Sequence, residues 1–384
     1  MEISVPDYRA QIARIKTKLP QARAVDSQYK VFGADGHKYR IAGPIPTRDL
    51  LDLEQHYGVS LPDDYRLFMQ EIGPGAGPFY GLYDPRQHAA DLVTDPQALR
   101  QPSQWKPNMS DEDWSALTLS FEPDDMSDAD FEQATDALFA GLLALGTQGC
   151  TYYNALVISG KYQGRVVNLD EERNLPKFAY ESNFLDWYER WLDEILDGTL
   201  MGERAGWFGY RRGGTEAELM AGFQAATESK QQCEFLLGLT RLPAVSSDTL
   251  DQLTQASASP DPELSLQALQ CLTQFDYPRA RPLLKALWPT EPLRVAKFVY
   301  WYAKEHAEDW VSEISSVFTT PNPDPELFDF ASYLAKTCTT DLTPLIQPFV
   351  NHPNSRLSKQ AVYIIEKIAE NRPSTWQRIR RNMN

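Results

Sequence analysis

The sequence predicts an α+β domain, in which an antiparallel sheet packs with helices, followed by an α-solenoid of helical pairs. Two observations lead to this fold class. Residues 58–83 pass from a helix end through a turn and a second helix into an aromatic loop, and two β-rich runs follow later in the chain. Residues 215–384 instead repeat an apolar helical pattern.

The first half contains a helix–turn–helix signal. Gly58 is placed to end one helix, and Asp63 begins the next after Leu61 and Pro62 turn the chain. The adjacent carboxylates at this helix start are explained by capping and by the helix dipole. The second helix has apolar residues at Leu67, Phe68 and Ile72, and a loop rich in Gly and Pro leads from it to Phe79, Tyr80 and Tyr83.

Strand signals lie on both sides of this motif. Residues 39–45 are predicted to form a short strand before the first helix. Downstream, the apolar run 156–158, a turn flanked by Gly160 and Gly164, and the β-rich run 165–169 predict two paired strands. Residues 184–196 place apolar side chains at helical spacing, so we expect a closing helix packed on the sheet.

This order of elements resembles the SUKH superfamily, the Smi/Knr-type proteins found as bacterial toxin-immunity proteins and as fungal regulators of cell-wall synthesis. The segments that carry the resemblance are residues 58–83, 142–169 and 184–196. The resemblance implies a SUKH domain over residues 1–200. It also implies a non-enzymatic immunity protein in the cytoplasm that blocks a cognate toxin, often a nuclease or other nucleic-acid-targeting enzyme, by direct contact.

The acidic charge is concentrated in the first half. Residues 1–200 contain 18 Lys and Arg against 32 Asp and Glu, a net of −14, which leaves −2 of the total of −16 for the rest. An acidic insertion, about residues 107–140, has two interpretations: a solvated segment that aids solubility, or a surface that mimics nucleic acid and attracts a basic toxin. The candidate toxin-binding residues are Asp111, Glu112, Asp113, Glu122, Asp124, Asp125, Asp128, Asp130, Glu132 and Asp136.

The second half has a repeat of about thirty residues. Leu264, Val295, Leu327 and Leu357 are spaced by 31, 32 and 30 residues, and each is followed four positions later by a small or branched residue. Helix-start signals precede them, and second apolar segments follow at residues 282–288, 310–318, 342–350 and 376–379. Residues 215–384 therefore resemble HEAT-type helical repeats, with residues 215–242 as an earlier pair that caps the array.

Residues 201–214 join the two halves. The segment is rich in Gly, which favours a linker, but it also contains Trp207, Phe208 and Tyr210. We expect a linker or a seam in which these rings pack between the two domains. A structural role for Trp207 is favoured over ligand stacking.

The remaining signals argue against catalysis, metals, cofactors and membranes. The five His are far apart, the Gly-rich loop lacks the Lys that follows a phosphate-binding loop, and no run approaches a membrane span of ~20 apolar residues. The four Cys are scattered, which favours buried free thiols and a cytosolic protein. Two alternatives stay open: a scaffold or regulator that recruits partners through its repeats, and an enzyme with an unfamiliar site.

Overall fold

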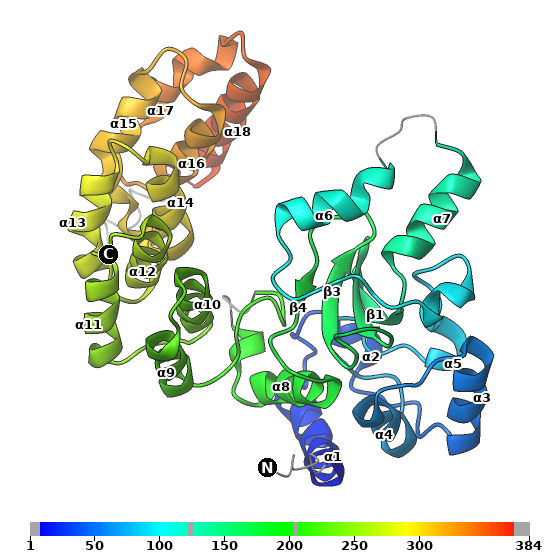
Figure 1. Ribbon diagram of the computed structural model, residues 1–384. Coiled ribbons are helices and arrows are strands. Elements are labelled where there is room, and N and C mark those ends of the chain that lie inside the picture. The colour runs from blue at the N-terminus through cyan, green and yellow to red at the C-terminus, as the bar shows by residue number, and fades with distance from the viewer. Residues whose placement is uncertain (1–7, 122–125, 203–205, 372–384) are drawn as a thin grey trace. The chain divides into compact units, whose positions relative to one another are not determined.

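The computed structural model describes residues 8–121, 126–202 and 206–371 (Figure 1). Contacts within the chain divide it into two compact units, Met1–Gly214 and Thr215–Asn384. The two units have separate hydrophobic cores and are described in turn.

The first unit combines a small sheet with many short helices. Its helices are α1 (Tyr8–Val25), α2 (Ala34–His37), α3 (Thr47–Tyr57), α4 (Asp63–Glu71), α5 (Pro85–His88), η1 (Pro96–Arg100), α6 (Asp111–Thr118), η2 (Leu119–Phe121), α7 (Asp128–Leu138), α8 (Phe184–Leu196) and η3 (Thr199–Met201). Its strands are β1 (Leu142–Gly149), β2 (Tyr152–Val157), β3 (Val166–Asp170) and β4 (Lys177–Phe178). The predicted antiparallel sheet is confirmed, in the order β1-β2-β3-β4.

Both faces of this sheet are buried. Successive strand residues point to opposite faces, so Leu143 and Leu156 join a core with α1, α3, α4 and α8, whereas Leu142 and Val157 join a second core with α6 and α7. Figure 1 shows α6 and α7 on one side of the sheet and α1, α4 and α8 on the other. The acidic segment is therefore a structural layer of the first unit as well as a charged surface.

The predicted helix–turn–helix is confirmed. Gly58 ends α3 in the left-handed conformation (φ 66°), and α4 begins at Asp63. Asp64 does more than favour its own helix start, because it is buried and its Oδ2 accepts the backbone N–H of Leu185 at 3.2 Å. Burial raises the pKa of Asp64 above its usual range, while hydrogen bonds from backbone N–H groups, that of Leu185 first among them, oppose the shift. The contact joins the start of α4 to the start of α8.

The predicted strand at residues 39–45 is wrong. Ile41 forms a single isolated bridge with Gly75, and Gly75 forms another with Leu82. A longer ladder is prevented because Tyr39 is left-handed (φ 56°) and Pro44 has no N–H to donate.

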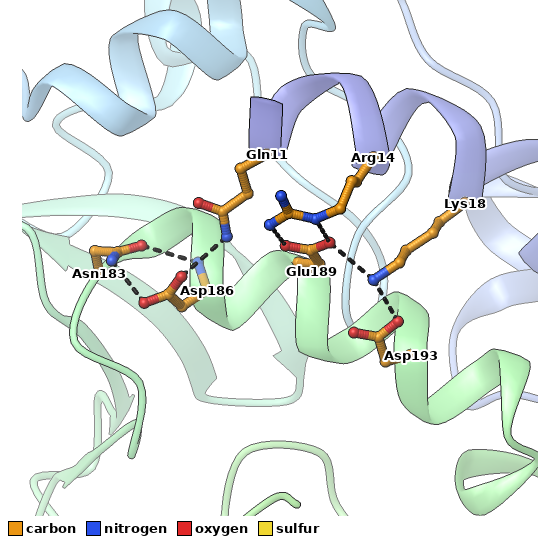
Figure 2. Close-up of polar contacts among 7 residues, drawn as sticks. All are labelled: Gln11, Arg14, Lys18, Asn183, Asp186, Glu189 and Asp193. Atoms are coloured by element: carbon orange, nitrogen blue, oxygen red, sulfur yellow. Dashed lines mark hydrogen bonds and ion pairs between the residues drawn. The ribbon is translucent and has the colours of Figure 1, made fainter. Parts of the chain in front are cut away.

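Helix α1 is held on α8 by a row of polar contacts (Figure 2). The Arg14 guanidinium donates to both Glu189 oxygens at 2.8 Å, and Lys18 Nζ lies 2.8 Å from Glu189 Oε1 and 2.6 Å from Asp193 Oδ1. Further along, Gln11 Nε2 donates to Asp186 Oδ1 at 2.9 Å. Burial alone would raise the pKa of Glu189, but the hydrogen bonds from Arg14 and Lys18 outweigh it and lower the pKa to about 2.

The second unit is helical throughout its described part. It contains α9 (Glu216–Ala225), α10 (Ser229–Leu239), α11 (Ser247–Ala256), α12 (Pro262–Phe275), α13 (Tyr277–Leu287), α14 (Pro292–Tyr302), η4 (Lys304–Trp310), α15 (Val311–Thr319), α16 (Pro325–Ala335), α17 (Thr343–Ile346), η5 (Gln347–Asn351) and α18 (Ser355–Asn371). The predicted helical region is confirmed, and α12, α14, α16 and α18 contain the four spaced anchors. Helix α11 was not predicted, and the predicted segment 376–379 lies outside the described residues.

The helix-start signals of the repeats act as predicted. The Asp261 carboxylate accepts the N–H groups of Glu263 and Leu264, and Asp324 accepts that of Leu327. The anchors Val295 and Leu357 are fully buried, whereas Leu327 is half-buried. All four Cys are free thiols, but the prediction that they are buried holds for Cys271 alone, and Cys150 is exposed.

The aromatic side chains of residues 201–214 pack on the first unit. Phe208 is buried beside Trp187, with ring centroids 5.8 Å apart, and the Tyr210 hydroxyl donates to Gln148 Oε1 at 3.1 Å. Trp207 stacks on Phe32 at 5.7 Å. The side chains of Trp207, Phe208 and Tyr210 therefore pack on Phe32, the sheet and α8.

Replacing Glu189 with Gln should destabilise the first unit by about 1–3 kcal/mol at pH 7, because it removes a carboxylate that two cations hold in a buried position. The wild-type contribution is fully present above the ordinary pKa of 4.5 and is lost as the pH falls toward the folded pKa of about 2. Between the ordinary pKa of 4.5 and the folded pKa of about 2, Glu189→Gln should therefore lose less stability than the wild type does. Urea unfolding followed by Trp fluorescence measures both effects.

Glu71→Gln is the matched control. Glu71 also pairs with a cation of α1, Lys16, at 2.7 Å, but both side chains are about half exposed. An exposed pair contributes about 0–1 kcal/mol. Equal losses in the two variants would contradict the role assigned to Glu189.

Candidate functional site

The first part of the candidate site is helix α6, which presents acids at its start. Ser110 caps the helix and forms a reciprocal capping box with Asp113, whose carboxylate also lies 2.7 Å from Lys106 Nζ. The hydrogen bond from Lys106 lowers the pKa of Asp113. The opposite face is anchored by the buried Trp114, whose Nε1 donates to the Arg173 carbonyl at 2.8 Å.

Helix α7 presents the second group of acids. Ser127 caps it by accepting the N–H of Asp130, and donates its hydroxyl to the Asp130 carboxylate at 2.6 Å. Near the other end, Asp136 accepts the backbone N–H groups of Thr94 and Asp95 at 2.6–3.1 Å. Leu138 is buried against the sheet. Asp136 therefore fixes the loop before η1 to α7.

A groove of about 700 Å³ lies between η1 and α7. Its charged lining consists of Asp95, Glu132 and Asp136, among the residues that the structure describes. Side-chain amides of four Gln and the methyl groups of four Ala complete most of the wall; the amides come from Gln97, Gln101, Gln104 and Gln133. Carboxylates and amides together can accept and donate hydrogen bonds along an extended basic segment.

The ten predicted acids fall into three groups. Glu122, Asp124 and Asp125 lie outside the described residues. Asp113, Asp130 and Asp136 are engaged in caps, an ion pair or a loop contact, as described above. The other four have no hydrogen bond or ion pair to another described residue, and all are exposed: Asp111, Glu112, Asp128 and Glu132.

The structure brings Glu132 and Asp136 together on one groove, and places α6 and α7 over the same face of the sheet. Sequence reasoning missed Asp95 and the four Gln of the groove. The two walls are separated by about forty residues in the chain, so no local pattern relates them. The pair Asp95-Pro96 is a helix-start signal that could have located η1.

Few described side chains are arranged as they would be in a catalytic or metal-binding site. His88 Nδ1 lies 2.8 Å from Asp91 Oδ2, and this pair is partly exposed. In the described ranges, no three His, Cys, Asp or Glu side chains are grouped so that they could hold a metal ion. Nor does any helix within those ranges have both the length and the apolar character that crossing a membrane requires.

Comparison with protein families assigns the domain. Residues 44–190 match the SMI1 / KNR4 family (SUKH-1), a span that runs from the turn before α3 to the middle of α8. Residues 44–190 form a SUKH-1 domain. The SUKH-1 domain includes the sheet, both acidic helices and the groove, whereas α1, the segment after α8 and the helical unit lie outside it. No curated protein and no solved structure is significantly similar to the chain.

Asp136→Ala should destabilise the first unit by about 1–2 kcal/mol, because the N–H groups of Thr94 and Asp95 lose a charged acceptor. Asp128→Ala, which removes an exposed carboxylate from the same helix, should change stability by no more than about 0.5 kcal/mol. Urea unfolding of both variants tests this division between structural and free acids. Equal effects would show that the division is wrong.

Proposed function

We propose that this chain is a toxin-immunity protein that binds and neutralises a cognate toxin domain by direct contact. The observation that supports it most is the pair of acidic helices on the outer side of the SUKH-1 domain, where four carboxylates are left without a partner among the described residues. Unpaired carboxylates on a rigid layer keep their full charge available to a basic surface. The toxin contact is proposed for the acids of residues 111–136.

The toxin class follows from the charge. A nuclease or other nucleic-acid-targeting toxin has a basic cleft that holds phosphates. Glu132 and Asp136 on the groove, with Asp128 at the start of the same helix, present negative charge as a row that a basic cleft could accept in place of its substrate. We propose that the acidic helices act as a substrate mimic in the cytoplasm.

We propose two modules with separate tasks. Residues 1–200 form the SUKH module with its acidic segment at about 107–140, residues 201–214 join the modules, and residues 215–384 form the HEAT-like module. The helical module would add a second contact to the toxin or bind another cellular protein. Either role uses the extended surface that stacked helical pairs provide.

A cytosolic scaffold or regulator is the second candidate. It is favoured by exposed aromatic side chains on the helical unit, where Trp301 on α14 is 62% exposed and Tyr363 on α18 is 46% exposed. Trp and Tyr are enriched at the centres of protein interfaces. In this case the repeats, and not the acidic helices, would recruit the partner.

The two functions can be separated by capture and rescue. The tagged full chain would be used to capture partners from its own cells at moderate salt, and each partner identified by mass spectrometry. We expect one stoichiometric toxin domain whose toxicity, when it is produced in a host cell, is abolished by co-production of this chain. Capture of several housekeeping proteins, with no rescue from any of them, would favour the scaffold.

Reversing the charge of Asp128 and Glu132 to Lys should slow association with the captured toxin at least about tenfold at low salt, because electrostatic steering is lost. The salt dependence of the association rate should also become shallower. The control is the pair Asp35→Lys and Asp52→Lys, which makes the same charge change at two exposed acids elsewhere on the first unit, of which Asp52 has an exposed ion pair with Arg48 at 3.8 Å. An unchanged rate and salt dependence, or equal effects in both pairs, would contradict the acidic interface.

A further inference from the structure

The groove between η1 and α7 offers hydrogen-bonding groups as well as charge. Four Gln side chains line it, all exposed, and their amides have no hydrogen bond to another described residue: Gln97, Gln101, Gln104 and Gln133. A side-chain amide has two N–H donors and a carbonyl acceptor. The groove can therefore both donate and accept hydrogen bonds along its length.

The two walls of the groove are fixed to each other within the first unit. Asp136 on α7 accepts two backbone N–H groups from the loop before η1, and the Gly141 N–H donates to the Ala98 carbonyl at 3.1 Å. Gly141 is left-handed (φ 68°), and a Cβ there would lie 2.6 Å from the Gln101 carbonyl oxygen. A groove whose walls are already fixed loses little conformational entropy on binding.

The charge of the groove has one sign. Its described lining contains three carboxylates and no Lys or Arg. The cations nearest in sequence have other partners, since Arg100 Nε donates to the Tyr57 carbonyl at 2.7 Å and Lys106 Nζ lies 2.7 Å from Asp113 Oδ2. Residues 122–125, outside the described ranges, contain acids and no base, so the sign of the charge does not depend on them. The groove is thus complementary to a basic occupant.

The shape and chemistry of the groove favour a polypeptide as that occupant. Most of its described lining residues are exposed and none is aromatic. A small ligand needs a pocket that buries most of its surface, and a nucleic-acid base needs a ring on which to stack. A polypeptide main chain instead presents one N–H and one carbonyl per residue, which side-chain amides can pair with.

We propose that this groove binds an extended polypeptide segment in which Lys or Arg alternates with small residues. Its main chain would pair with the Gln amides, and its basic side chains would contact Glu132 and Asp95. Alternate side chains of an extended chain point to the same side, so every second residue faces the groove. The inference rests on the proposed function for the source of the segment, a loop or tail of the toxin.

The test uses peptide probes and the full chain. Acetyl-Gly-Ser-Arg-Ser-Arg-Ser-Gly-amide would be titrated against the deuterated, nitrogen-15-labelled protein, and the Gln side-chain NH₂ signals followed by NMR. We expect saturable shifts of the groove Gln signals with a Kd on the order of 1 mM at low salt, and binding at least about threefold weaker at high salt. The same peptide with Gln in place of both Arg should bind at least about fivefold more weakly.

Substitutions test both walls and both kinds of contact. Gln101→Ala and Gln133→Ala should each weaken binding of the Arg peptide at least about threefold, with an unchanged thermal midpoint as the check on folding. The matched control is Gln55→Ala, which removes an exposed Gln of α3 and should leave binding unchanged. Glu132→Gln should weaken binding at least about threefold, whereas Glu112→Gln, on α6 outside the groove, should change it by less than about twofold.

Three results would overturn the proposal. The first is an absence of saturable shifts of the groove Gln signals. The second is equal weakening by Gln55→Ala or by Glu112→Gln, since the peptide would then respond to the general charge of the unit. The third is spermidine binding as tightly as the peptide, which would indicate a polyamine site. None of these results bears on toxin neutralisation, which capture and rescue test without the peptide.

Discussion

Burial of the sheet on both faces is the constraint on which the first unit depends. All five residues of β3 are buried, and alternate strand residues belong to different cores. A sheet buried on both faces needs helices on both sides. The segment before β1 must therefore supply an apolar underside, which it does with Trp114, Leu138 and Phe139, while its described acids are exposed or half-buried. The acidic helices are therefore also part of the layer that covers one face of the sheet.

Helix α8 is the second organising element, because segments from outside the SUKH-1 domain contact its buried charged side chains. Arg190 is almost fully buried and pairs with Glu181 and Glu194 at 2.6 Å each, while its remaining guanidinium nitrogen donates to the Arg211 carbonyl. Glu189, on the same helix, pairs with α1. A buried ion that loses its partner costs several kcal/mol. The flanking segments are thus fixed parts of the unit.

The features that could be predicted are those set by local chemistry. Gly58 marks a helix end because glycine readily adopts the left-handed conformation that follows a last turn. Asp63 and the run around Asp261 mark helix starts because carboxylates are favoured beside the free N–H groups of a first turn. Contacts across the chain could not be predicted: Arg14 and Glu189 are 175 residues apart. The strand prediction at residues 39–45 failed because Tyr39 has a left-handed backbone, which is rare for a bulky residue and has no sequence signal here. The groove was missed since Asp136 reaches a loop some forty residues earlier.

The charged surface of the first unit acts over a distance. Charge on α6 and α7 is felt over about 8 Å at physiological salt, so it can orient a basic partner before contact. A net charge of −16 opposes contact with the phosphates of nucleic acid.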